Sequence, residues 1–274
     1  MSPTRSQRIE ARDFIERMTL PVRQAMAAVR WLEGRVRNRP KASEVTPEKA
    51  ALTDADCVSQ EILLVALRDY VPWVSLNVEE DTPSAACFAG NDTDETIVID
   101  PIDGTLRYLL GDGPYAILVG LERAGRVEAA LVGLPQADTL IRTVRGQGSE
   151  IACGADPFER ARLTAPGSQV FVSYGLPAPV EERLKALGLQ RTPAAGGVIG
   201  VAPLLDGIAG AVRMSRAADG LSRRAWVASL PTLEAGGRVE GLYETFPAQY
   251  ERGVMGMLVA DSDDGIRRLR ETLD

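Results

Sequence analysis

A short run in the first half of the chain places two carboxylates three positions apart at the end of an apolar stretch. It reads Ile97-Val98-Ile99-Asp100-Pro101-Ile102-Asp103-Gly104-Thr105. Two carboxylates at this spacing, just beyond a buried strand, can converge on one hard cation such as Mg²⁺. The N–H groups of Gly104 and Thr105 are placed to receive a phosphate, above all if a helix begins there. Asp-Pro and Asp-Gly are also common turn formers, but the whole run favours a metal and phosphate site.

Two further acidic segments have spacings that suit the same site. Glu79-Glu80-Asp81 follows another predicted strand, where a third metal ligand is expected, although three successive acids are also typical of a solvated loop. Thr53 and Asp56 directly precede an amphipathic pattern and have the spacing of a helix capping box. Asp56 is therefore either a capping residue or a catalytic carboxylate.

The absence of histidine from all 274 residues limits the chemistry that the chain can perform. Histidine general bases, catalytic triads with histidine, and histidine-ligated zinc or copper are excluded. The three cysteines form no CxxC pair, which argues against structural zinc or a disulfide framework and is typical of the cytoplasm. We therefore expect chemistry based on carboxylates, hydroxyls, Lys or Arg, cysteine or a carboxylate-bound metal, with a cytoplasmic location.

The composition is that of an average globular protein, with 45% apolar and 25% charged residues. A net charge of −7 without a long Lys/Arg run argues against binding to a nucleic-acid polymer. The N-terminus lacks the apolar core of a signal peptide. The most apolar stretch, 196–212, contains Pro203 and Asp206, and it predicts a buried helix rather than a membrane span.

The predicted elements divide the chain into residues 1–155 and 156–274. In the first part, spacings of three and four predict helices over 12–37, which Pro21 would kink or divide, and over 57–70. Strands are predicted over 73–78, 96–99, 115–121, 127–134 and 139–144. These strands are expected to form an antiparallel sheet that carries the metal site, with a hairpin turn at 146–148.

The second part alternates strands and helices, which favours an α/β layer that carries substrate-specificity elements. Strands are predicted over 170–173, 238–243 and 255–260, and helices over 180–187, 196–212, 221–235 and 263–273. Trp31, Trp73 and Trp226 are expected in the core. Cys153 is expected to be an inert thiol because no base stands near it.

In order and spacing, these motifs resemble the inositol monophosphatase family. That family is part of the lithium-sensitive, magnesium-dependent phosphatase superfamily, with fructose-1,6-bisphosphatases and 3′-nucleotidases. The Asp-Pro-Ile-Asp-Gly-Thr hexamer is the specific element, and the supporting motifs are Thr53-x-x-Asp56, Glu79-Glu80 and Glu234-Ala235-Gly236-Gly237. The resemblance implies a layered αβαβα sandwich, a homodimer, and Mg²⁺-dependent hydrolysis of a small phosphomonoester such as an inositol, sugar or nucleotide phosphate.

The resemblance also implies roles for individual residues. Glu79, Asp100 and the carbonyl of Ile102 would hold the first Mg²⁺, and Asp100 and Asp103 would share the second. Such cations activate water and clamp the attacking and leaving oxygens.

The catalytic set carried over from the family is Asp56, Glu79 and Thr105. Asp56 and Thr105 would orient the attacking water beside the first metal. Gly104 and Thr105 would receive the phosphate.

The second half departs from the family pattern. The family has a Trp-Asp pair upstream of its Glu-Ala-Gly-Gly motif, and that aspartate completes the second metal site. At the matching distance this chain has Arg223 and Arg224. Gly210 stands where an aspartate often recognises the sugar, and Arg107-Tyr108 replaces an asparagine-aromatic pair.

Several interpretations of Arg224 remain open. Asp206 or Asp219 could enter the site in its place, so that two metals still bind. Alternatively, Arg224 replaces the second cation and contacts the phosphate directly, as suits a guanidinium. A third possibility is that hydrolysis has been lost. Finally, Arg223 and Arg224 could lie on a solvated helix face that the spacing misaligns.

Two classes of function follow from these alternatives. The first is an enzyme that acts on a small phosphorylated metabolite with Mg²⁺. The second is a degenerate family member that binds a phosphorylated ligand or a partner without efficient catalysis. Arg213 and Arg216 could face an anionic ligand in either case.

Overall fold

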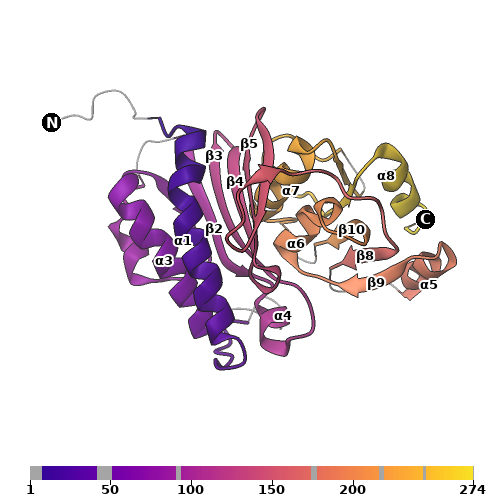
Figure 1. Cartoon of the computed structure of the whole chain (residues 1–274), viewed down its shortest axis with the longest axis horizontal. Coiled ribbons are helices and arrows are strands. Elements are labelled where there is room, and N and C mark those ends of the chain that lie inside the picture. The colour runs from indigo at the N-terminus through magenta and orange to yellow at the C-terminus, as the bar shows by residue number, and fades with distance from the viewer. Residues whose placement is uncertain are drawn as a thin grey trace.

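Two helices, α1 (Ala11–Leu32) and α3 (Asp54–Tyr70), form the outer layer of the computed structural model, which describes residues 8–41, 51–90, 94–173, 178–215, 219–242 and 245–273. They lie side by side against the first sheet (Figure 1). Pro21 lies inside α1 without dividing it, so the alternative of a second helix is wrong. The buried apolar stripe continues from Met18 to Val22, and its burial outweighs the one backbone hydrogen bond that proline removes. The helix ends at Leu32, before the predicted Arg37.

α3 begins at the predicted capping box. Thr53 Oγ1 accepts a hydrogen bond from the N–H of Ala55 at 3.1 Å, and Asp56 Oδ2 accepts one from the N–H of Thr53 at 2.8 Å. The helix therefore starts at Asp54, three residues before the predicted Cys57. Only one oxygen of Asp56 serves the cap, which leaves Oδ1 for another partner.

The first sheet has seven strands in chain order from β1 to β7. Their bounds are β1 Ser75–Asn77, β2 Glu95–Asp103, β3 Ala116–Arg123, β4 Arg126–Leu134, β5 Thr139–Val144, β6 Gly148–Cys153 and β7 Glu159–Arg160. Short 3₁₀ turns cover Pro83–Cys87 and Pro135–Ala137. The five predicted strands are confirmed, as is the turn before β6, whereas β6 and β7 were not predicted. The expectation of a wholly antiparallel sheet is wrong for one pair, since β1 runs parallel to β2.

The second sheet has five strands in the order β11-β12-β10-β8-β9. Its strands are β8 Gln169–Val172, β9 Gln190–Pro193, β10 Ile208–Met214, β11 Arg238–Gly241 and β12 Gly256–Ala260. The helices of this half are α5 Ala178–Ala186, α6 Gly196–Gly200, α7 Arg224–Glu234 and α8 Asp263–Arg270, with a 3₁₀ turn at Ala202–Leu204. This half alternates strand and helix as predicted.

The predicted buried helix over 196–212 is wrong. The segment forms the short helix α6, a 3₁₀ turn and the central strand β10. Proline at 203 prevents the helix from continuing, and Gly207 has a φ of +80°, which turns the chain into the strand. An apolar run of this kind suits a buried strand as well as a buried helix. The segment is buried, as expected, but its periodicity did not identify the element.

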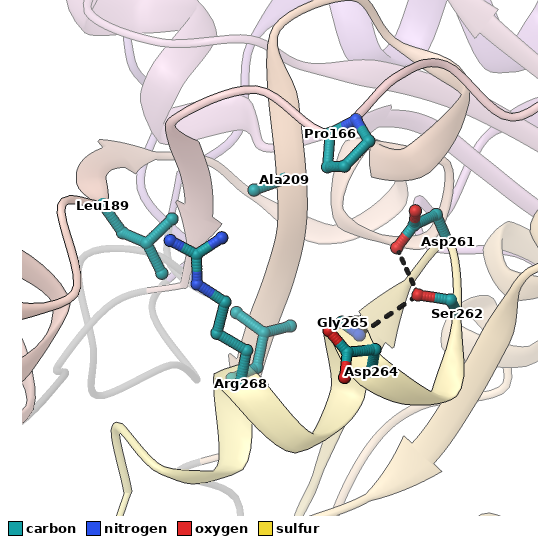
Figure 2. A pocket seen from close by; sticks show the side chains of 9 residues that line it. Pro166, Leu189, Ala209, Asp261, Ser262, Asp264, Gly265 and Arg268 are labelled. Carbon is teal, nitrogen blue, oxygen red and sulfur yellow. Dashed lines mark hydrogen bonds between the residues drawn. The ribbon is translucent and has the colours of Figure 1, made fainter.

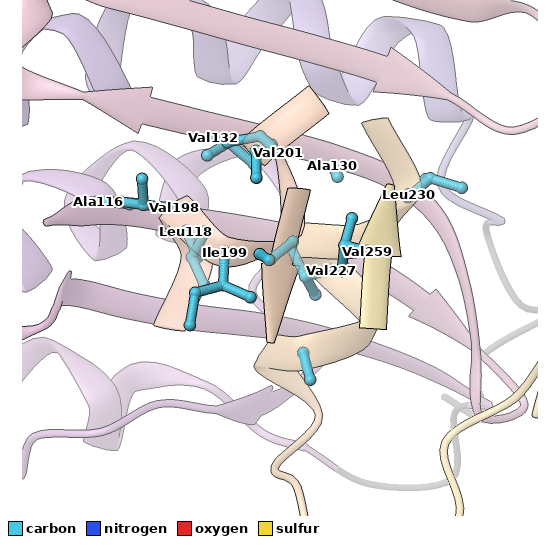
Figure 3. Close-up of a cluster of buried hydrophobic side chains, with 14 of the residues drawn as sticks. Ala116, Leu118, Ala130, Val132, Val198, Ile199, Val201, Val227, Leu230 and Val259 are labelled. Carbon is cyan, nitrogen blue, oxygen red and sulfur yellow. The ribbon is translucent and has the colours of Figure 1, made fainter. Parts of the chain in front are cut away.

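The layers follow the sequence αβαβα, which confirms the fold class. α1 and α3 cover the first sheet, α6 and α7 lie between the sheets, and α5 and α8 contact the second sheet (Figure 1). Figure 3 shows the core between the sheets, where side chains of β3 and β4 meet those of α6, α7 and β12. The division into domains at 155 stays a prediction, although the first sheet extends to Arg160.

Gly120 on β3 allows α7 to lie directly on the first sheet. A Cβ at Gly120 would come within 2.4 Å of Val227 Cγ2, so any larger residue would push the helix away. Arg224 precedes Val227 by three residues and therefore shares its face of the helix. The close contact at Gly120 thus sets how near Arg224 comes to the first sheet.

The tryptophans differ in their burial. Trp226 is buried and stacks on Phe246, as expected of a core residue. Trp73 is partly buried, whereas Trp31 is 65% exposed, so its predicted place in the core is wrong. Trp31 lies near the end of α1, outside the stripe that faces the sheet. Among the described helices, none is long and apolar enough to cross a membrane.

Candidate functional site

The carboxylates predicted from the sequence meet at the end of β2. β1 and β2 are parallel neighbours with Asn77 opposite Val98, so continuing the register brings Glu79 beside Asp100. Asp103 ends β2, and α4 (Thr105–Leu110) begins two residues later. A helix therefore begins directly after Gly104, which is the condition under which the N–H groups of Gly104 and Thr105 would best receive a phosphate.

Asp56 and Thr105 form a hydrogen-bonded pair beside these carboxylates. Thr105 Oγ1 lies 2.9 Å from Asp56 Oδ1 and 3.0 Å from the carbonyl oxygen of Ile102. One hydroxyl proton serves one acceptor at a time, so Thr105 donates either to Asp56 or to the carbonyl of Ile102. Burial raises the pKa of Asp56 to about 7, although the hydrogen bonds from Thr53 and Thr105 act in the opposite direction. This carboxyl can therefore take up or release a proton near neutral pH.

Two basic side chains lie among the acids. Lys41 Nζ lies 3.0 Å from Glu79 Oε1 and 2.7 Å from Glu80 Oε1. Arg224 Nη1 lies 3.3 Å from Glu79 Oε2, and its Nε lies 3.4 Å from Asp100 Oδ2. About a fifth of each of the side chains of Lys41, Glu79 and Arg224 is exposed, so the cluster can be reached from solvent.

The charges in this cluster strongly affect one another. Burial would raise the pKa of Glu79, but Arg224 and Lys41 hold it below its usual value. Burial and the neighbouring charge of Glu79 raise the pKa of Asp100 well above its usual value. Burial would lower the pKa of Arg224, whereas Asp100 and Glu79 raise it, so the guanidinium stays charged. Ionisation is therefore favoured at Glu79 and opposed at Asp100.

Asp103 connects the site to the layer between the sheets. It accepts a hydrogen bond from the N–H of Gly197, at the start of α6. A Cβ at Gly196 would lie 1.6 Å from Asp103 Oδ1, so only glycine leaves room for this carboxylate. Burial raises the pKa of Asp103, while the charges of Arg213 and Arg224 oppose that rise.

Four buried atoms around this cluster have no hydrogen-bond partner in the described structure. They are Asp100 Oδ1, Asp103 Oδ2, Arg213 Nη1 and Arg224 Nε. Unpaired polar atoms are costly inside a protein and often mark a place for a ligand or an ion. Arg224 Nε keeps its 3.4 Å ion-pair contact with Asp100 Oδ2, so Asp100 Oδ1, Asp103 Oδ2 and Arg213 Nη1 are the buried atoms of the cluster with neither a hydrogen bond nor an ion pair in the described structure.

The two adjacent arginines point to different partners. Arg223 forms an ion pair with Glu122 on β3 and stacks over the ring of Tyr250. Arg224 enters the carboxylate cluster, so the interpretation that both lie on a solvated face is wrong. Asp206 and Asp219, the alternative ligands, are exposed residues in loops. Arg216 lies outside the described residues.

Sequence reasoning missed one member of the cluster and gave an incomplete reason for the glycine at 104. Lys41 was assigned only to a polar loop, because its partners lie about forty residues further along the chain. Gly104 has a φ of +107°, and a Cβ there would lie 2.9 Å from Ala195 Cβ, so backbone conformation and packing require glycine. The family's closing motif ends α7, where Glu234 accepts a hydrogen bond from the N–H of Gly148.

The described acids do not suit a pair of divalent cations. No three acidic or cysteine side chains in the described ranges are grouped so that they alone could hold a metal. Arg224 lies against Glu79 and Asp100, where the family has an aspartate ligand. Asp100 Oδ1 and Asp103 Oδ2, which have no hydrogen-bond partner, are the carboxylate oxygens that would be available to a single cation. Mg²⁺ is commonly held by one or two carboxylates while it keeps several waters.

A small separate pocket lies at α8, next to β10. Figure 2 shows Asp261, Ser262 and Gly265 joined by hydrogen bonds at its edge. None of the residues predicted for the site lines this pocket. Its other polar side chains are also engaged, Asp264 with Arg267 and Arg268 with the carbonyl of Leu187, so the cluster at the end of β2 is the better candidate.

Comparisons with known proteins agree with the arrangement. Residues 16–176 match the model of the inositol monophosphatase family. A Nus factor SuhB from Pasteurella multocida is 30% identical over 100 residues, and an inositol-1-monophosphatase from Mesorhizobium japonicum is 30% identical over 98. Each match covers 36% of this chain. The matched segment spans about a third of each relative's own length, 36% of the Nus factor SuhB and 35% of the inositol-1-monophosphatase. The extragenic suppressor protein suhB from Bartonella henselae has a similar structure, with a TM-score of 0.73 at 18% identity, over 95% of this chain and 98% of that one.

Proposed function

Because the chain belongs to the inositol monophosphatase family, we propose that it hydrolyses a small phosphomonoester at the end of β2. Family membership supports a phosphatase-type function. The substrate would be an inositol, sugar or nucleotide phosphate, with water as the nucleophile. We also predict that the protein forms a homodimer in the cytoplasm and binds neither nucleic-acid polymers nor membranes.

The observation that carries the proposal is the position of Asp56 and Thr105 beside two unpaired carboxylate oxygens. Asp100 Oδ1 and Asp103 Oδ2 are the atoms available to hold one Mg²⁺, together with the carbonyl of Ile102. Mg²⁺ would lower the pKa of water and offset the negative charge of the phosphate. Thr105 lies within hydrogen-bond distance of both Asp56 and Ile102. This pair is therefore placed to orient a water molecule and to take up its proton.

Asp56 has the properties of the general base in this reaction. Its carboxyl is fully buried, and its raised pKa of about 7 keeps it able to accept a proton under neutral conditions. The cap contacts from Thr53 occupy Oδ2 and fix the side chain, so Oδ1 remains directed at Thr105. The N–H groups of Gly104 and Thr105 remain the proposed position of the phosphate.

In this proposal, Arg224 supplies the positive charge that the second metal ion would supply in the family pattern. It lies against Glu79 and Asp100 and keeps about a fifth of its side chain exposed. A guanidinium can bind phosphate through two parallel hydrogen bonds, which suits both binding and charge neutralisation. The interpretation with one metal and one arginine is therefore the one that we favour.

The proposal is tested by measuring phosphate release from a panel of phosphomonoesters with and without Mg²⁺. We expect release only with Mg²⁺, and we expect Asp56→Asn to abolish it while Asp206→Asn, an exposed control, leaves it unchanged. No release from any compound at millimolar Mg²⁺ would refute the enzyme.

A second candidate is a protein that binds a phosphorylated ligand or a partner without hydrolysing it. The observation that favours it is the internal pairing of Glu79, which contacts both Lys41 and Arg224 and so needs no metal. Ligand binding in EDTA, together with no phosphate release in Mg²⁺, would support this candidate over the enzyme.

A further inference from the structure

Arg213 projects from the second sheet toward the candidate site. It lies on β10, where Ala211 packs into the core between the sheets and Val212 packs into the core on the other face. Side chains alternate along a strand, so Arg213 lies on the same face as Ala211 and points toward the first sheet. Its partner across the sheet, Met257, also belongs to the core between the sheets.

Among the acids of the site, Asp103 is the one whose pKa the charge of Arg213 affects. Arg213 exerts the largest favourable charge effect on this carboxylate. Nevertheless, Arg213 Nη1 and Asp103 Oδ2 both lack a hydrogen-bond partner in the described structure, so the two atoms are not bonded to each other. A buried guanidinium nitrogen therefore faces the site from the second sheet with its hydrogen-bonding capacity unused.

The other two cations of the site are already engaged. Lys41 contacts Glu79 and Glu80, and Arg224 contacts Glu79 and Asp100. Among these three cations, Arg213 is the one for which the described residues provide no ion pair. It is also the one that lies on the sheet opposite the proposed phosphate position at Gly104 and Thr105.

We propose that Arg213 binds a second anionic group of the substrate, either a carboxylate or another phosphate. This inference rests on the proposed function and adds a substrate class to it, the doubly anionic phosphomonoester. A ligand with its scissile phosphate at the first sheet would extend toward the second sheet and place its other anion against Arg213. A carboxylate or phosphate matches the guanidinium geometry, whereas a neutral hydroxyl leaves the charge uncompensated.

Three compounds that share one sugar-like chain and one phosphate test the inference. Glucose 6-phosphate has no second anion, 6-phosphogluconate has a carboxylate, and glucose 1,6-bisphosphate has another phosphate. Their binding is measured by calorimetry on the whole chain in EDTA, where no hydrolysis is expected. The variants are Arg213→Gln, Arg213→Lys and the exposed control Arg252→Gln.

We expect the unmodified protein to bind at least one doubly anionic compound about tenfold more tightly than glucose 6-phosphate. Arg213→Gln should remove this preference and leave the affinity for glucose 6-phosphate within about twofold. Arg213→Lys keeps the charge and should retain part of the preference, and Arg252→Gln should retain all of it. Which of the two compounds is preferred identifies the second group as a carboxylate or a phosphate.

Equal or undetectable binding of all three compounds by the unmodified protein would overturn the inference. An equal loss for all three in Arg213→Gln would also overturn it, because Arg213 would then act on the shared phosphate or on Asp103. If Arg213→Gln does not fold, Arg213→Lys decides: a folded Lys variant that keeps only part of the preference in EDTA supports the inference, and an unchanged preference overturns it. Failure of the proposed function would appear differently, as absent phosphate release with the binding preference intact.

Discussion

Arg224 Nη1 lies 3.3 Å from Glu79 Oε2, between two acids that the sequence had assigned to metal ions. The same guanidinium reaches Asp100, so one side chain neutralises both carboxylates. α7 can bring it there because Gly120 leaves space for Val227. A permanent positive charge therefore occupies part of the region where a family member with aspartate at this position would bind its second cation.

Arg224→Asp should increase the affinity for Mg²⁺ by about tenfold or more, because it removes a fixed cation and adds a ligand. Without Mg²⁺ the additional buried acid should lower the melting temperature, and Mg²⁺ should restore it. Calorimetric titration with Mg²⁺ measures the first effect and thermal unfolding the second. Arg223→Asp is the matched control, since the neighbouring arginine pairs with Glu122 instead. Equal titrations for the two variants would contradict the assignment.

Asp100→Asn should abolish Mg²⁺ binding, since it replaces a carboxylate that has an unpaired oxygen in the proposed site. The amide is a weaker ligand and cannot supply the missing charge. The measurement is again a Mg²⁺ titration, with Asp206→Asn as an exposed control. An unchanged titration would show that the cation binds elsewhere.

Asp56 should make the protein less stable as pH rises. Burial raises its pKa from 3.8 to about 7 in the folded chain, so unfolding releases the proton more readily. Its stabilising effect is complete below about pH 4 and is lost as pH rises through about 7, an effect of roughly 4 kcal/mol at most. Asp56→Asn should remove this part of the pH dependence of the free energy of unfolding, measured by denaturant titration in EDTA. Parallel pH profiles for the two proteins would argue against a raised pKa.

Gly120→Ala should destabilise the protein by about 1–3 kcal/mol, because the new methyl group collides with Val227. The double variant Gly120→Ala with Val227→Ala should recover part of this loss, since the smaller side chain makes room. Unfolding in denaturant measures both effects. Because α7 carries Arg224, the single variant should also change the Mg²⁺ titration. Additive losses in the double variant would show that the two residues do not interact.

The local sequence was sufficient for many of the elements. The capping box at Thr53, the strand that ends at Asp100 and the helix after Gly104 all depend on residues close together in the chain. Such short-range signals involve backbone hydrogen bonds and turn geometry that neighbouring residues control. The local sequence was not sufficient for the segment 196–212, because a uniformly apolar run suits a strand and a helix equally.

The candidate site likewise contains some residues that the sequence identified and others that only the tertiary structure revealed. By itself, the sequence determined which carboxylates stand at the end of β2, that no histidine takes part, and that an arginine replaces an expected aspartate. Only the tertiary structure decided that Arg224 rather than Arg223 enters the cluster, that Lys41 joins it, and that Arg213 faces it unpaired. Contacts between residues far apart in the chain depend on how helices and sheets pack, and no local pattern encodes that packing.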